Sequence, residues 1–150
     1  MPIGNALNLK GTPGQRVVVL PDGNIGVESI AISQSSPIRA LNTVYQISTT
    51  KNCNVYYSVD ISESISLAGG TAATIFLEIA TNSAFTTGLQ VISKPTLSFT
   101  SPLSVTLNLV LISTAQLSGC VPAGYYARLR TVTTTGTPIF TFQASQEVLW

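Results

Sequence analysis

Acidic side chains are the first residues to consider for chemistry in this chain, because it contains no histidine. Histidine is the commonest general base and metal ligand, so its absence excludes Ser-His-Asp sites, Cys-His sites and histidine-based metal sites within one chain. Asp60 and Glu63 are close in sequence, but an odd spacing on a strand directs two side chains to opposite faces. We therefore expect these two acids to be solvated or to lie beside a turn.

Glu78 offers a second acidic pair. It could meet Asp60 across a hairpin and act like the two acids of a glycosidase, whose carboxyl groups lie about 5 to 9 Å apart. The interpretation we favour is that Glu78 forms an ion pair with Arg128 or Arg130. The sequence thus predicts that the protein is not an enzyme, and we expect no catalytic residue, no metal ligand, no cofactor-binding residue and no cofactor.

Two tyrosine doublets, Tyr56-Tyr57 and Tyr125-Tyr126, are candidates for binding rather than catalysis. Each could place one ring in the core and one outside, where a tyrosine can stack on a sugar or become buried in an interface. We favour core and subunit contacts for these rings.

Cys53 and Cys120 are the only cysteines. They could form a disulfide, but single cysteines are more often buried apolar residues in a reducing compartment. We favour free thiols and leave the pairing open.

Charge is scarce in this sequence, since 9% of the residues are charged against about 25% in ordinary globular domains. A net charge of +1 gives no case for the clustered Lys and Arg that bind a nucleic-acid backbone. No run approaches the ~20 apolar residues of a membrane helix. We therefore expect neither nucleic acid nor a membrane as a partner. A surface so poor in charge favours self-association, with Phe76, Tyr126 and Val132 as outward contacts.

The stretch 121–150 organises the predicted fold. Residues 125–132 alternate, so that odd-numbered side chains share one face of a strand and even-numbered side chains share the other. The segment 136–138 (Gly-Thr-Pro) then predicts a turn into a further strand. We expect the rest of the chain to pack on this stretch.

Two hairpins are predicted earlier in the chain. The first joins residues 16–20 to 25–32 through a turn at 21–24, and the second joins residues 54–66 to 72–81 through a turn at 67–70. Further predicted elements are strands over residues 38–48, 89–93, 96–100 and 103–112, and a single helical turn at 82–85 capped by Asn82. The side chains expected to point inward are Val55, Tyr57, Val59, Ile61 and Ile65, and Val105, Leu107, Leu109 and Leu111.

Eight or more short strands with almost no helix signal predict an all-β fold, an antiparallel two-sheet β-sandwich that is jelly-roll-like, with a short N-terminal arm and hairpin. Residues 1–15 are rich in Gly and Pro and predict an extended arm. The polar segment 33–37 predicts a link. We therefore divide the chain into an N-terminal arm and hairpin at residues 1–36, an attachment segment, and a β-sandwich domain at residues 37–150.

Five segments carry a resemblance to a known family: RALN (39–42), YSVDIS (57–62), FLEIA (76–80), VPAGYYARLRT (121–131) and GTPIFTFQASQEVL (136–149). Together they resemble a domain that recurs in tailed-bacteriophage virion proteins, both capsid decoration (cement) proteins and the C-terminal heads of phage fibres. The resemblance covers about residues 37–150. It implies a trimeric, jelly-roll-like sandwich with a structural role in the virion, and it identifies no catalytic residue.

The N-terminal segment favours one of these two roles. A fibre needs a long shaft, whereas about 36 residues precede the domain and carry neither heptads nor Gly-X-Y triplets. We therefore expect a capsid decoration protein that stabilises the head by bridging capsid subunits. Its expected partners are itself, as a homotrimer, and the major capsid protein. The expected location is the capsid surface of the virion, after synthesis in the bacterial host cytoplasm, since the chain starts without the basic patch and apolar run of a secretory signal.

The alternative is the receptor-binding head domain of a phage tail or capsid fibre. Its loops would bind a glycan or protein on the host surface.

Overall fold

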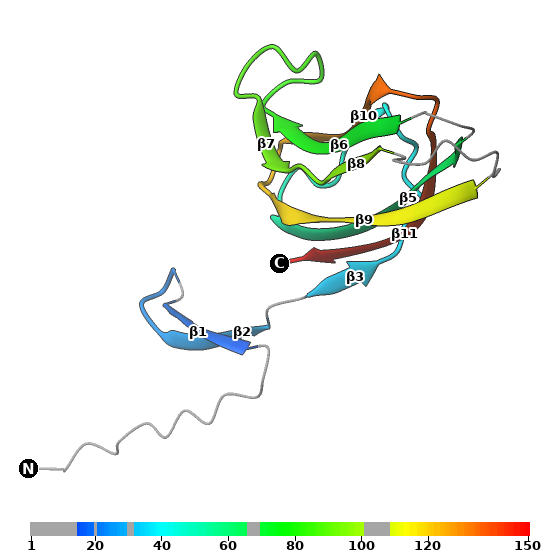
Figure 1. Ribbon diagram of the computed structural model, residues 1–150. Helices are drawn as coiled ribbons and strands as arrows, with labels where there is room; N and C mark the ends of the chain where they lie inside the picture. Colours follow the sequence, from blue (N-terminus) through cyan, green and yellow to red (C-terminus); the bar gives the residue numbers. More distant parts are fainter. Residues whose placement is uncertain (1–14, 20, 30–31, 66–69, 101–108) are drawn as a thin grey trace, which may run out of the picture. The chain divides into compact units, whose positions relative to one another are not determined.

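The computed structural model describes residues 15–19, 21–29, 32–65, 70–100 and 109–150. Its regular elements are antiparallel strands, which form one hairpin and two larger sheets (Figure 1). The prediction of an all-β antiparallel sandwich is confirmed. The strands are β1 (Gln15–Val19), β2 (Ile25–Ser29), β3 (Ser33–Ser35), β4 (Val44–Gln46), β5 (Cys53–Ile65), β6 (Gly70–Ala80), β7 (Gln90–Ser93), β8 (Thr96–Thr100), β9 (Leu109–Val121), β10 (Tyr126–Thr135) and β11 (Ile139–Leu149).

Strand pairing in the sandwich follows the path of a jelly roll. One sheet has the order β3-β11-β5-β9, and the other has the order β4-β10-β6-β7 with β8 also paired to β6. The first strand of the sandwich therefore pairs with the last, the second with the next to last, and β5 with β9. This nesting is that of a long hairpin folded over on itself. Figure 1 shows the two sheets as separate layers.

The core lies between these layers and follows from side-chain alternation. The expected inward residues of β5, namely Val55, Tyr57, Val59 and Ile61, are each at most 1% exposed. The side chain of the fifth, Ile65, lies outside the described residues. Odd-numbered apolar side chains face them from the other layer: Ala73, Ile75, Leu77 and Ile79 on β6, and Ala127 and Leu129 on β10.

The second predicted hairpin is wrong. β5 pairs with β9 and β11, whereas β6 pairs with β10, β7 and β8, so the two strands lie in different sheets. β10 and β11, which flank the turn at 136–138, also lie in different sheets. A glycine-rich signal predicts that the chain changes direction, but it does not tell whether the next strand returns in the same sheet or crosses to the other layer.

Two segments before β5 differ from expectation. The predicted link contains β3, which pairs with β11. The strand expected over 38–48 is reduced to β4, because residues 41–42 form a turn with Asn42 at a φ of 58°. Asn42 fixes this turn against β10: its Oδ1 accepts the Thr131 N–H at 2.9 Å, and its Nδ2 donates to Thr131 Oγ1 at 2.9 Å.

Two later segments differ as well. Residues 82–85 form a non-helical turn, in which Phe85 has a φ of 55° and Asn82 Oδ1 accepts the N–H groups of Thr86 and Thr87 at 3.1 and 3.3 Å. The strand expected at 103–112 is described from residue 109 onward and continues to Val121, with Ala115 and Leu117 buried on its inner face. Residues 103–108, which include Val105 and Leu107, lie outside the described part.

The chain divides into two compact units, the second of which spans Gln34–Leu149, whereas our boundary fell after residue 36. The first unit contains the predicted hairpin, which is confirmed: β1 and β2 pair in register from Gln15 with Ser29 to Val19 with Ile25. In its turn Gly23 has a φ of 82°. Residues 1–14 of the expected arm lie outside the described residues.

Candidate functional site: two outer faces of the sandwich

The acidic pair considered for catalysis does not form. Asp60 lies on β5 and Glu78 on β6, in different sheets. Glu78 is 2% exposed and is bound by two arginines of β10: Arg128 donates to Oε2 at 2.6 Å from Nη2, and Arg130 donates to Oε1 at 2.7 Å from Nη2. The interpretation of Glu78 as an ion-pair partner is confirmed, with both arginines rather than one.

Register explains this ion triad. Arg128 pairs with Glu78 across the β10-β6 ladder and Arg130 pairs with Phe76, so all four side chains lie on the outer face of the sheet. Burial by itself raises the pKa of Glu78, but the hydrogen bonds from Arg130 and Arg128 outweigh it and hold the pKa below its ordinary value. The same contact raises the pKa of Arg130. The carboxylate is therefore ionised and fixes both guanidinium groups.

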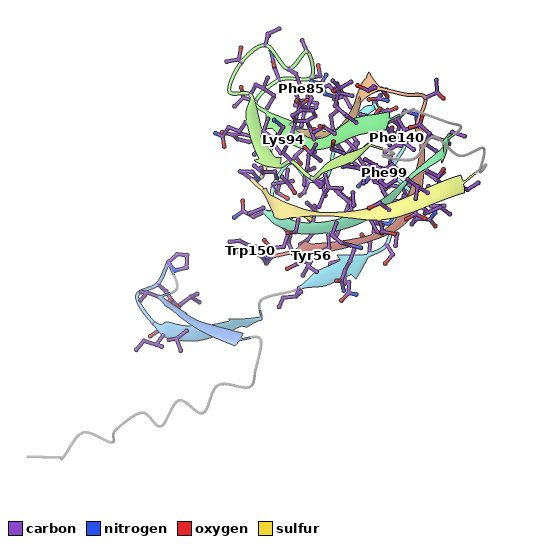
Figure 2. The ribbon with its side chains drawn as sticks, in the orientation of Figure 1. Tyr56, Phe85, Lys94, Phe99, Phe140 and Trp150 are labelled. Carbon is purple, nitrogen blue, oxygen red and sulfur yellow. The ribbon has the colours of Figure 1, made fainter. Side chains whose placement is uncertain are left out.

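Aromatic rings extend the triad into what we call the cationic face, made of Phe76, Phe85, Lys94, Arg128 and Arg130. The Arg128 guanidinium lies 4.2 Å from the centre of the Phe85 ring, and that of Arg130 lies 4.2 Å from the Phe76 ring. Lys94 Nζ lies 5.2 Å from the same Phe76 ring. Glu78 binds two of these three cations, Arg128 and Arg130, so the cationic face together with Glu78 is net positive. Figure 2 labels Phe85 and Lys94 on the layer that contains β6 and β10.

The outer face of the other sheet is different in chemistry. Val110, Ile112 and Ile139 are 60%, 66% and 66% exposed, and we call them the apolar patch. Ser62 pairs with Ile112 on one side and with Ile139 on the other, which places the two isoleucines in one row across β9, β5 and β11. Such clusters of exposed apolar side chains mark interaction sites in soluble proteins.

Acids border the apolar patch. Asp60, one row further along β5, accepts hydrogen bonds from Thr114 Oγ1 at 2.6 Å and from Gln143 Nε2 at 2.7 Å. Glu63 Oε1 accepts the Thr137 N–H at 2.7 Å, while its Oε2 is buried without a hydrogen-bond partner among the described residues. Asp60 is bound by neutral side chains, and Glu63 lies beside the turn at 136–138, one of the two environments expected for these acids.

A pocket of about 320 Å³ joins the apolar patch to Glu63. Its lining consists of Ser62, Glu63, Val110, Thr137 and Ile139. Within the residues that the structure describes, no three His, Cys, Asp or Glu side chains gather in a way that could hold a metal ion. Glu63 is the one titratable side chain in this lining, and the other described lining residues are apolar or carry hydroxyl groups.

An internal ion pair holds the beginning of the sandwich to its last strand. Glu147 on β11 is 2% exposed, and both of its oxygens accept from Arg39, at 2.8 Å from Nε and 2.7 Å from Nη2. Tyr57 donates its hydroxyl to Glu147 Oε1 at 2.6 Å. The Arg39 guanidinium also stacks 4.4 Å from the centre of the Tyr45 ring. We call these four side chains the clamp.

The clamp keeps its tyrosines protonated. Burial raises the pKa of Tyr45 to about 12, and burial together with Tyr45 and Glu147 raises the pKa of Tyr57 above its ordinary value. The hydrogen bonds that Arg39 donates to Glu147 raise the pKa of Arg39. The Tyr45 hydroxyl is buried and makes no well-directed hydrogen bond to any described residue, although Tyr57 is close enough to affect its pKa. The clamp is a structural device, since its ionised members are already paired.

Sequence reasoning did not find the clamp. Arg39 and Glu147 are separated by 108 residues, and nothing local relates them. Simple alternation from Phe140 and Phe142, which face the core, would have placed Glu147 outward, because a bulge between Phe142 and Ala144 shifts the register of β11.

The tyrosine doublets differ from each other. Tyr57 is buried and Tyr56 is exposed, so one ring lies in the core and one outside, which confirms the expected division for this doublet (Figure 2). Tyr125 and Tyr126 are both half-buried. Phe76 points outward as expected, and the side chains of Lys94 and Arg130 partly cover its ring.

Both cysteines are free, with Cys53 buried and Cys120 exposed. The register sets Cys53 opposite Val121 and Cys120 opposite Asn54, so the two thiols lie on adjacent strands but point to opposite faces of the sheet. Burial raises the pKa of the Cys53 thiol to about 11. The preference for free thiols is confirmed.

Comparison with known proteins gives one informative similarity. No protein-family model matches the chain, and no solved structure matches it. The chain is similar to the uncharacterized protein 443R of Invertebrate iridescent virus 6, with 40% identity over 106 residues, which is 70% of this chain. The chain spans only 4% of the length of that protein. In the described part of the chain there is also no helix that is long and apolar enough to cross a membrane. The similarity therefore supports the coarser expectation, a viral protein.

Proposed function

We propose that this protein is a structural component of a virus particle, a homotrimeric capsid decoration protein that stabilises the shell by bridging capsid subunits. The observation that carries the proposal is the apolar patch on the outer face of a jelly roll. Jelly rolls are widely used in virus capsids. The similarity to a protein of an iridescent virus and the resemblance to phage virion domains both support a viral role.

The surface chemistry supports a role in protein contacts. Three isolated exposed apolar side chains would be ordinary, but Val110, Ile112 and Ile139 lie in two neighbouring rows of one regular sheet face. A protein bound across neighbouring capsid subunits stabilises the closed shell by mass action, because it binds the assembled state and not the dissociated one. Its contribution then increases with the free concentration of the decoration protein.

The proposal makes the N-terminal unit an attachment segment. A single two-stranded hairpin is at best marginally stable in water, and Val17, Val19 and Ile25 of this hairpin are more than half exposed. Such a hairpin gains stability by docking on another protein, for example by adding its strands to a sheet edge.

The direct test is a mass measurement followed by capsid binding. We expect a mass of three chains of 15.8 kDa each at tens of micromolar, and saturable binding to capsids prepared without the protein, with raised resistance of the shell to heat. A monomer that leaves capsid stability unchanged would contradict the proposal. An Ile112→Asp variant should lose capsid binding, whereas Tyr56→Asp, a second exposed position of the same sheet face, serves as the matched control.

The cationic face favours the second candidate, a receptor-binding head domain. Stacked arginine, lysine and phenylalanine side chains can bind acidic or planar groups of a host glycan. Binding of the protein to host cells, lost on Lys94→Glu and retained on Ile112→Asp, would replace the decoration role by this one.

A further inference from the structure

The free edge of β9 is the feature of the sandwich that most needs a partner. In the described residues β9 pairs with β5 on one side, in register over all thirteen residues from Leu109 to Val121, and with no strand on the other. The strand contains no charged residue, no proline and no bulge. Natural edge strands are protected by such features, because an unprotected edge pairs with another chain.

One half of this edge is open toward the interior. A pocket of about 270 Å³ lies where β9 approaches β8, and its lining includes Leu97 and residues 113–116. Toward the other end of β9 the sandwich is closed, because the side chain of Ile92 lies directly against Gly119. An added strand would therefore pair with the first half of β9, residues 109–116, and would cover the pocket.

The N-terminal hairpin has the matching chemistry. Val17 pairs with Val27, and Val19 pairs with Ile25, so these four positions share one face of β1 and β2. The opposite face carries Val18, which pairs with Gly26. Val17, Val19 and Ile25 are each more than half exposed, so the hairpin presents an apolar face of the kind that a half-buried sheet covers.

The segment between the hairpin and the sandwich is short. Ser29 ends β2 and Ser33 begins β3, so the four intervening steps span at most about 14 Å. β3 and β9 are the two opposite edges of their sheet. A strand added beyond β9 lies four strand spacings from β3, or about 19 Å. These two lengths favour a hairpin from a second copy as the partner of β9.

We propose that the β1-β2 hairpin of one copy adds to the free β9 edge of a second copy, alongside residues 109–116 and with its apolar side over the pocket. The contact is heterologous, since a hairpin meets an edge strand, so each copy offers one donor and one acceptor and a ring of three closes. The inference rests on the self-association in the proposed function, and it names the element that produces it.

The test uses paired lysine substitutions in the full chain, read by sedimentation and light scattering. Ser113→Lys places a charge at the open pocket, with Ser118→Lys as its control on the outer face of the same strand. Val19→Lys places a charge on the apolar side of the hairpin, with Val18→Lys as its control on the other side. We expect Ser113→Lys and Val19→Lys to lower the mass from three chains to one, and both controls to stay trimeric.

Mixing the two dissociated variants decides whether the contact is hairpin to edge. Ser113→Lys keeps an intact hairpin and Val19→Lys keeps an intact edge, so an equimolar mixture should form a complex of two chains. Dissociated variants that do not combine would overturn the inference, as would variants that both remain trimeric. A wild-type chain that is monomeric at tens of micromolar overturns the homotrimer itself, which separates the two failures. If Ser113→Lys does not fold, deletion of residues 1–32 replaces it: a deleted chain that stays trimeric overturns the inference, and a deleted chain that becomes monomeric supports it.

Discussion

Replacing Glu147 by glutamine is expected to destabilise the sandwich by about 3 kcal/mol. The carboxylate is 2% exposed and accepts hydrogen bonds from Arg39 at 2.8 and 2.7 Å and from Tyr57 at 2.6 Å. Hydrogen bonds to a charged group contribute roughly 1.5 to 3 kcal/mol each, and removing one partner of a buried ion pair costs about 3 to 5 kcal/mol. We take the lower end of the range for a broken buried ion pair, because Arg39 is 21% exposed and water can solvate its guanidinium once Glu147 is replaced.

Thermal unfolding at fixed protein concentration measures this effect. A loss of about 3 kcal/mol corresponds to a fall in Tm of roughly 10 °C for a domain of this size. Asp60→Asn is the matched control, because Asp60 is only partly buried and its bonds to Thr114 and Gln143 involve neutral groups. We expect less than about 1 kcal/mol from this change.

A double substitution tests the physical cause. Replacing both Arg39 and Glu147 by methionine removes the two charges together, so no buried charge is left without a partner. The free energy of unfolding lost in the double variant should be at least about 1 kcal/mol smaller than the sum of the losses in Arg39→Met and Glu147→Met made singly. Equal Tm values for Glu147→Gln and Asp60→Asn, or strict additivity in the double variant, would refute the view that the clamp holds residue 39 to β11.

Three further predictions concern the core, the ion triad and a turn. Leu117→Ala should cost about 2 to 5 kcal/mol and Gln116→Ala far less, because Leu117 is buried and Gln116 is exposed on the same strand; equal losses in urea titrations would show that the register of β9 is wrong. Because the pKa of Glu78 is lowered in the folded state, the ionised carboxylate stabilises the fold above the ordinary value of 4.5, and this stabilisation is lost as the pH falls through the lower folded value. Glu78→Gln should therefore weaken the dependence of the unfolding free energy on pH below pH ~4.5. The same pH dependence in the variant and the unaltered protein would contradict this. Gly136→Ala should cost roughly 1 to 3 kcal/mol, because Gly136 has a φ of 81° and an added Cβ would press on the Glu63 carboxylate; a chemical denaturation midpoint equal to that of the unaltered protein would show that this turn relaxes freely.

The fold class was available from the sequence because alternation is a local property. Inward and outward positions in β5 and β10 follow directly from the period of two, and residues 55, 57, 127 and 129 are buried as the pattern predicts. Scarcity of charge likewise indicated a surface suited to contacts. An ion pair of Glu78 with Arg128 or Arg130 was also expected from the sequence, whereas the binding of both arginines follows from the register of β6 and β10.

Only the tertiary structure decided which strands are neighbours. The pairings β5-β9 and β4-β10 connect segments far apart in the chain, and the local sequence of β5 fits a partner in either layer equally well. The joining of Arg39 to Glu147, the grouping of Val110 and Ile112 with Ile139, and the separation of Asp60 from Glu78 all follow from that choice. Side-chain period determines which face of a strand is apolar, whereas the burial of that face against the rest of the core determines the partner strand, and that burial is a property of the whole chain.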